Sequence, residues 1–175
     1  MSTPTENSAL PDAEALFTAL KAQMAPAIAY DAKLVGVYSG GAWLADRLAR
    51  ELDGEHEVGS VDVSFYRDDL STSGLKSTVR STHIPFSVEG AHIVLVDDVL
   101  FTGRSIRAAI NTLFDYGRPA SVQLAVLVDR GGRELPVAAD YVGAPLIVAA
   151  DLMLALGRDD AGRFTLTTEP RRVRA

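Results

Sequence analysis

The stretch VLVDDVLFTGRS, residues 94–105, decides the fold class of this chain. It begins with bulky aliphatic residues, which are typical of a strand buried on both faces, and this run ends at Asp97 and Asp98. A short loop with a Thr-Gly pair follows, and apolar residues then recur at helical spacing over 105–116. A buried strand, a polar loop and an amphipathic helix in this order form one unit of an α/β protein.

The same order of elements appears on both sides of this stretch. Upstream, an apolar strand at 34–38 leads through Ser-Gly-Gly into a helix, and downstream an apolar strand covers 122–128. Repeated units of this kind predict a central, mostly parallel sheet of about four or five strands flanked by helices. The strands at 92–97 and 122–128 are expected to be neighbours in that sheet. The other predicted elements are a strand at 58–66 and helices at 12–25, 42–52 and 105–116.

The whole chain, residues 1–175, is expected to form a single domain, because its length suits one hydrophobic core. Residues 1–11 are polar and contain two prolines, which predicts a loose lead-in. The segment 67–88 interrupts the strand–helix pattern with a stretch rich in Ser and Thr. We expect it to form a small antiparallel flap.

The composition is that of a globular protein, and it excludes several classes of function. Hydrophobic residues make up 47% of the chain and charged residues 23%, which excludes intrinsic disorder. The absence of Cys excludes disulfides and thiolate metal sites and fits a reducing cytoplasm. No apolar run is long enough to span a bilayer and no secretory signal is visible, so we expect a cytoplasmic protein without a membrane partner. The net charge of −6 disfavours broad affinity for nucleic acids.

Polar loops at 39–41, 97–105 and 129–133 are expected at the carboxyl ends of the strands, where open α/β sheets bind ligands. In the middle loop, hydroxyl groups, a glycine and the free amides of a helix start suit a phosphate. Asp97 and Asp98 can accept hydrogen bonds from ribose hydroxyls and suit Mg²⁺ bound through water. The pattern predicts a sugar-phosphate site, but carboxylates that only cap the next helix would give the same pattern.

Residues 94–105 resemble the phosphoribosyl pyrophosphate (PRPP) motif of type I phosphoribosyltransferases. Other segments narrow the resemblance to the PyrR family, which attenuates pyrimidine operons and also has uracil phosphoribosyltransferase activity. The resemblance implies a type I phosphoribosyltransferase fold and the Mg²⁺-dependent reaction of uracil with PRPP to give UMP and pyrophosphate. The segments that carry it are DVSFYRDDLS (62–71), FDYGRPAS (114–121), QLAVLVDRGGRELP (123–136) and ADYVG (139–143).

The resemblance also implies roles for particular residues. Asp97 and Asp98 would hold the ribose hydroxyls, and Arg67 and Arg80 would bring positive charge to the pyrophosphate. Asp68 would contact Mg²⁺ indirectly. The remaining implied substrate contacts are Ser39, Gly40 and Gly41 in the pyrophosphate loop, Val99, Leu100, Phe101, Thr102, Gly103, Arg104 and Ser105 around the 5′-phosphate, and Arg130 and Leu154 on the uracil side.

Gly40 marks a departure from the family, which commonly carries Thr-Arg-Gly where this chain has Ser-Gly-Gly. A cation beside the leaving group stabilises the transition state more than the ground state. We therefore predict UMP binding with weak turnover, and a gain in turnover for Gly40→Arg. The alternative is that Arg67 or Arg80 replaces the missing charge, in which case turnover is ordinary.

Two further readings of the function stay open at the level of sequence. The family's regulatory role implies binding of an mRNA leader by a homodimer or tetramer. Phosphate contacts dominate such affinity, and no Lys/Arg cluster is evident before the last five residues of this chain. The other reading is a nucleotide sensor that responds to UMP or UTP with little turnover. Residues 150–175 match the family poorly.

Overall fold

The computed structural model describes residues 10–64 and 81–171, and its centre is a sheet of five parallel strands. The order across the sheet is β2-β1-β3-β4-β5. The predicted strands at 92–97 and 122–128 are neighbours, paired in parallel from His92 opposite Ser121 to Leu100 opposite Asp129. This pairing confirms the predicted α/β fold. The strands are β1 (Lys33–Val37), β2 (Val58–Val61), β3 (His92–Leu100), β4 (Ser121–Asp129) and β5 (Tyr141–Pro145).

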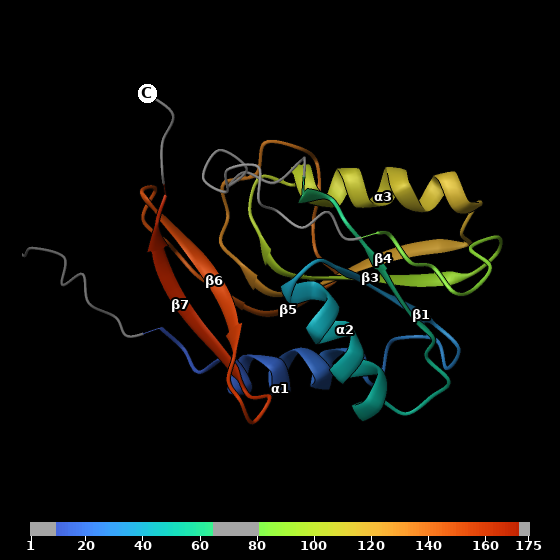
Figure 1. Cartoon of the computed structure of the whole chain (residues 1–175), viewed down its shortest axis with the longest axis horizontal. Helices are drawn as coiled ribbons and strands as arrows, with labels where there is room; N and C mark the ends of the chain where they lie inside the picture. The colour runs from blue at the N-terminus through green and yellow to red at the C-terminus, as the bar shows by residue number, and fades with distance from the viewer. Residues whose placement is uncertain (1–9, 65–80, 172–175) are drawn as a thin grey trace, which may run out of the picture.

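Helices cover both faces of this sheet (Figure 1). α1 (Ala13–Met24) and α2 (Gly40–Glu51) pack on one face, and α3 (Arg104–Tyr116) packs on the other. Side chains alternate along β3, so Val94 is buried in the core with α1 and α2, whereas its neighbour Ile93 is buried with α3. None of the helices in the described ranges is long and apolar enough to cross a membrane.

The helices begin and end close to the predicted positions. Asp12 caps α1 by accepting a hydrogen bond from the amide of Glu14 at 3.4 Å. α2 starts at Gly40 rather than at the predicted residue 42. Gly103 precedes α3 with a φ of 93°, a left-handed conformation that glycine adopts without steric cost.

The C-terminal segment forms a second sheet, which the sequence analysis did not predict. β6 (Leu152–Arg158) and β7 (Phe164–Pro170) pair as an antiparallel hairpin. Leu154, Leu156 and Phe164 of this hairpin are buried in the core beside α1. β6 opens with five apolar residues in a row and β7 with an alternation of apolar residues and threonine, so both carry a local strand pattern, and packing against α1 adds to their stability.

The flap predicted at 67–88 lies mostly outside the described residues, which resume at Ser81. In the described part of the segment, residues 81–88, the only β-pairing is an isolated antiparallel bridge between His83 and Ser60. The antiparallel sheet that the described residues do contain is the β6–β7 hairpin. Residues 1–9, most of the predicted lead-in, also lie outside the described residues, as does the end of the strand predicted at 58–66.

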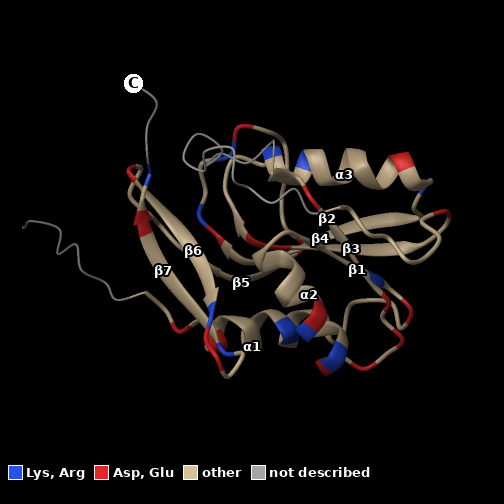
Figure 2. Cartoon of the chain, in the orientation of Figure 1, with Lys and Arg blue, Asp and Glu red and all other residues tan. Residues whose placement is uncertain are grey.

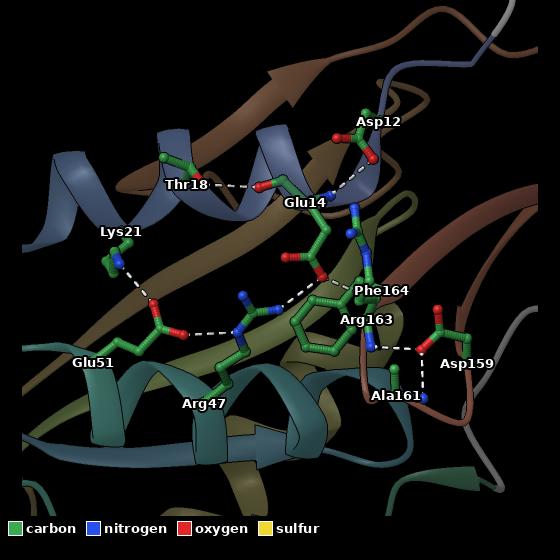
Figure 3. A network of polar contacts seen from close by, with 10 residues as sticks. All are labelled: Asp12, Glu14, Thr18, Lys21, Arg47, Glu51, Asp159, Ala161, Arg163 and Phe164. Carbon is green, nitrogen blue, oxygen red and sulfur yellow. Dashed lines mark hydrogen bonds and ion pairs between the residues drawn. The ribbon is translucent and has the colours of Figure 1, made fainter.

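A network of ion pairs attaches the hairpin to α1 and α2 (Figure 3). Arg47 donates from Nη1 to Oε1 of Glu14 at 2.8 Å and from Nε to Oε1 of Glu51 at 2.8 Å. The same Oε1 of Glu14 accepts a hydrogen bond from the amide of Phe164 at 2.6 Å. The Arg47 guanidinium lies 4.3 Å from the ring centroid of Phe17 and 5.1 Å from that of Phe164. Residues at opposite ends of the chain are thereby joined through one carboxylate.

These contacts lower the pKa of two carboxyl groups, those of Glu14 and Glu51. The hydrogen bond from Arg47 is the largest of the contributions that leave the pKa of Glu14 below its ordinary value of 4.5. For Glu51, the hydrogen bond from Lys21 comes first and that from Arg47 second, and the pKa of this group is lowered as well. Both carboxylates therefore stay ionised to a lower pH in the folded protein than in the unfolded chain.

We expect Glu14→Gln to reduce the free energy of unfolding by about 1 kcal/mol at neutral pH and by much less in acid. Because the folded-state pKa of Glu14 is lowered, the ionised carboxylate contributes stability above about pH 4.5. This contribution is lost as the pH falls through the folded-state pKa. Urea unfolding of both proteins at about pH 7 and about pH 3 measures the effect. Glu55→Gln, at an exposed Glu before β2, is the control. A loss in the free energy of unfolding for Glu14→Gln that is equally large at both pH values would contradict the prediction.

Candidate active site

The carboxyl ends of β1, β3 and β4 lie at one edge of the sheet, because these strands are parallel (Figure 1). The three polar loops predicted from the sequence, at 39–41, 97–105 and 129–133, follow or overlap these strand ends. Chain segments far apart in the sequence are therefore neighbours at this edge, as expected for a ligand site in an open α/β sheet.

Asp97 and Asp98 lie near the end of β3, and the backbone holds both carboxylates in place. Asp97 is 7% exposed, and its Oδ1 accepts a hydrogen bond from the amide of Asp98 at 2.9 Å. In turn, Oδ1 of Asp98 accepts from the amide of Val99 at 2.9 Å. The residue that precedes α3 is Gly103, which has no side chain to cap the helix. The hydrogen bonds described above join the two carboxylates to amides of β3 rather than of α3, which argues against the reading in which they only cap the next helix.

Glycines bring the start of α2 against the end of β3. A Cβ atom at Gly40 would lie 2.6 Å from Oδ2 of Asp98, and one at Gly41 would lie 2.2 Å from the carbonyl oxygen of Val96. At Gly41 the close atoms belong to the backbone of β3, whereas at Gly40 they belong to the Asp98 side chain, which would have to shift to admit a Cβ. The sequence analysis interpreted Gly40 only as the loss of a cation. The structure gives this glycine a steric reason, and an arginine would displace the Asp98 carboxylate.

The loop before α3 is held in place by hydrogen bonds of Thr102 and Arg104. Thr102 is 2% exposed, and its Oγ1 accepts a hydrogen bond from the amide of Arg104 at 3.2 Å. Its carbonyl oxygen accepts from the amides of Glu134 at 3.0 Å and Leu135 at 3.1 Å. The Arg104 side chain is exposed and donates to Oε2 of Glu134 from Nε at 3.0 Å and from Nη2 at 2.7 Å. The first turn of α3, including Ser105, is thus fixed at the same edge as Asp97 and Asp98.

Asp129 and Arg133 belong to this site, although sequence reasoning did not single them out. Arg133 donates from Nη2 to Oδ2 of Asp129 at 2.6 Å and from Nη1 to the carbonyl oxygen of Phe101 at 2.7 Å. Burial raises the pKa of Asp129, but hydrogen bonds from Arg133 and from the amide of Gly131 outweigh it, so the pKa is lowered overall. The signal in the sequence was the polar loop 129–133 at a strand end. The contact of Arg133 with Phe101 could not be predicted from that pattern.

Arg130 lies on the side of the site that the resemblance assigns to uracil. Its guanidinium donates to the carbonyl oxygens of Leu152 at 2.9 Å and Ala149 at 3.3 Å. The same group lies 4.1 Å from the ring centroid of Phe101. Leu154 is on β6, the strand that begins at Leu152, and its side chain is buried in the core. The structure thus joins Arg130 to the loop before α3, and it places Leu154 in the hairpin.

Ser39 precedes α2, and the Leu100 side chain is buried in the core. Three other predicted site residues, Arg67, Asp68 and Arg80, lie outside the described residues. Within 10–64 and 81–171, no group of three or more His, Asp or Glu side chains could hold a metal ion. The carboxylates of Asp97 and Asp98 are hard oxygen donors of the kind Mg²⁺ takes. The chemistry of these two donors therefore fits Mg²⁺.

Comparisons with known proteins agree with this geometry. A family model described as a phosphoribosyl transferase domain matches residues 11–151. The bifunctional protein PyrR of Ralstonia nicotianae is 54% identical over 167 residues, covering 91% of this chain and 95% of that protein. The bifunctional protein PyrR of Nitrosococcus oceani is 44% identical over 153 residues, covering 86% of each. A hypoxanthine-guanine phosphoribosyltransferase structure from Bacillus anthracis has a TM-score of 0.64 at 18% identity, covering 81% of this chain and 85% of that chain, which shows a common fold. The chain belongs to the PyrR family, and its fold is that of a phosphoribosyl transferase domain.

Proposed function

We propose that this protein transfers the 5-phosphoribosyl group of PRPP to uracil, giving UMP and pyrophosphate. The observation that carries the proposal is the position of Asp97 and Asp98 between the starts of α2 and α3. This arrangement offers oriented carboxylates for ribose hydroxyls and a helix start for the 5′-phosphate. The choice of uracil rests on membership of the PyrR family and on Arg130 at the base side of the site.

The chemistry follows from the charges that develop. As the bond from C1 of PRPP to the pyrophosphate oxygen breaks, positive charge builds on the ribose ring. N1 of uracil then bonds to C1 and gives up its proton, which goes to the released pyrophosphate or to water. The Asp97 and Asp98 carboxylates hold the ribose hydroxyls, and the first turn of α3 binds the 5′-phosphate. Acceleration comes from positioning and electrostatics and needs no covalent nucleophile. Mg²⁺ bound with PRPP would neutralise charge on the leaving pyrophosphate. Among the described residues, Asp97 and Asp98 are the ones that would help to hold this ion.

The direct test is an assay of uracil with PRPP and Mg²⁺, run beside calorimetry of UMP binding. Hypoxanthine and guanine serve as competing bases, because the same fold occurs in a hypoxanthine-guanine phosphoribosyltransferase. We expect UMP formation from uracil and no nucleotide from either purine. Turnover of a purine would overturn the base assignment. Tight UMP binding without turnover of uracil would favour the nucleotide sensor.

Gly40→Arg is expected to lower kcat/KM by about tenfold or more, which reverses the expectation from sequence alone. The new Cβ would lie 2.6 Å from Oδ2 of Asp98, so this carboxylate must leave its position. Gly40→Ala introduces the same Cβ without a charge and is the matched comparison. If the steric argument is correct, both variants are impaired. A gain for the arginine variant with a loss for the alanine variant would restore the missing-cation hypothesis.

We propose regulation of pyrimidine genes as the second function, supported by family membership and by the word "bifunctional" in the relatives' names. Along the described ribbon, Lys and Arg are interspersed with Asp and Glu (Figure 2). Together with the net charge of −6, this distribution disfavours general affinity for RNA, so the proposal is recognition of a specific leader sequence. Filter binding of a pyrimidine-operon leader, with and without UMP and across salt concentrations, tests this against a poly(A) control. Light scattering of the protein tests the proposed dimer or tetramer.

A further inference from the structure

Phe101 connects the loop before α3 to two other parts of the molecule. Its carbonyl oxygen accepts a hydrogen bond from Arg133, and the Arg130 guanidinium lies 4.1 Å from its ring centroid. A second guanidinium, that of Arg171, lies 5.1 Å from the same centroid. Arg171 follows β7 directly, so the last described residue of the chain reaches the loop that carries the site.

Arg130 and Arg171 both contact the Phe101 ring and both bind the segment 149–152. Arg130 donates to the carbonyl oxygens of Ala149 and Leu152. Between them lies Asp151, whose carbonyl oxygen accepts a hydrogen bond from the amide of Arg171. The amide of Arg171 therefore binds the same segment, 149–152, that the Arg130 side chain binds. The guanidinium groups of both residues contact the Phe101 ring.

The far end of the hairpin is anchored independently. β7 runs from beside α1 to Arg171 (Figure 1). At its start, the Phe164 amide donates to Glu14, which is paired with Arg47 (Figure 3). A strand fixed at its first residue against both helices can hold Arg171 in a defined place, which a free chain end could not do.

We propose that Arg171 is a positioning residue for the base side of the substrate site. Through Phe101 and residues 149–152 it keeps Arg130 oriented toward the uracil position. This inference rests on the proposed uracil phosphoribosyl transfer. The contacts described for Arg171 reach the Phe101 ring and residue Asp151, whereas the 5′-phosphate is assigned to the first turn of α3. We therefore expect uracil binding to depend on Arg171 more than PRPP binding does.

Steady-state kinetics of Arg171→Ala test the inference. We expect the KM for uracil to rise about fivefold, the size of a partly exposed cation–π contact, with kcat and the KM for PRPP changed less than about twofold. Arg171→Lys is expected to recover part of the loss, because an ammonium also interacts with an aromatic ring. Arg171→Gln provides a second uncharged variant if the alanine protein folds poorly. Arg50→Ala, at an exposed Arg in the last turn of α2, is the control and should match the wild type.

A double-mutant cycle with Phe101→Leu separates positioning from a general effect on the fold. If Arg171 acts through Phe101, Arg171→Ala raises the uracil KM of the Phe101→Leu protein less than about twofold. An equal rise in both backgrounds, or an unchanged uracil KM in both Arg171→Ala and Arg171→Gln, would overturn the inference while leaving the proposed function standing. Absence of uracil turnover in the wild-type protein would overturn the proposed function, and this inference with it.

Discussion

The double variant Asp97→Asn, Asp98→Asn is expected to lose about 100-fold or more in kcat/KM for uracil phosphoribosyl transfer and to bind UMP much more weakly. Hydrogen bonds to a charged group are worth about 1.5–3 kcal/mol each, and the variant removes both charges. Asparagine has nearly the volume of aspartate and keeps the Oδ1 acceptor. The hydrogen bonds from the amides of Asp98 and Val99 therefore survive, and the fold should too.

The measurements are steady-state kinetics, calorimetry of UMP binding and a thermal melt of each protein. Asp115→Asn is the matched control, because Asp115 is exposed on α3 near the end opposite the site. It should behave as the wild type in all three measurements. UMP affinity that is unchanged in the double variant would refute the assignment of the ribose contacts to Asp97 and Asp98.

Gly41→Ala is expected to destabilise the fold by about 3 kcal/mol, the upper range for overpacking a core. The new Cβ would lie 2.2 Å from the carbonyl oxygen of Val96 and 3.0 Å from Cα of Asp97. Both partners are backbone atoms of the central strand β3, so relief requires α2 to move away from the sheet. For a chain of this length, the melting temperature should fall by about 6–12 °C.

Gly40→Ala is the informative comparison for this prediction. The nearest atom to its new Cβ is the end of the Asp98 side chain, which can rotate, although Cβ and Cγ of Asp98 are also close. We expect Gly40→Ala to lose nucleotide affinity with a smaller fall in melting temperature, and Gly41→Ala to lose stability first. Equal melting temperatures for Gly41→Ala and the wild type would show that α2 can shift freely, and would contradict the close packing described above.

Much of the site could be predicted because it lies close together in the sequence. Asp97 and Asp98 end a strand of aliphatic residues, and Thr102 and Gly103 open the next helix, all within one short stretch. Local periodicity identifies the strand and the helix, and the parallel sheet then places the loops at one edge. The β6–β7 hairpin was missed although its sequence has an apolar run at 152–156 and a short alternation at 164–167. Its packing against α1 is the part that no local pattern reveals.

The sequence was enough to predict the strands and helices of the main sheet other than β5, the parallel class of this sheet and the edge at which the polar loops meet. These features depend on side-chain periodicity and on neighbours along the chain. The contacts of Gly40 with Asp98, of Arg133 with the Phe101 carbonyl oxygen and of Arg171 with the Phe101 ring come from the tertiary structure alone. Each of these contacts joins residues that are not neighbours in the sequence. Their distances are set by how helices and strands pack, which no local pattern of residues specifies.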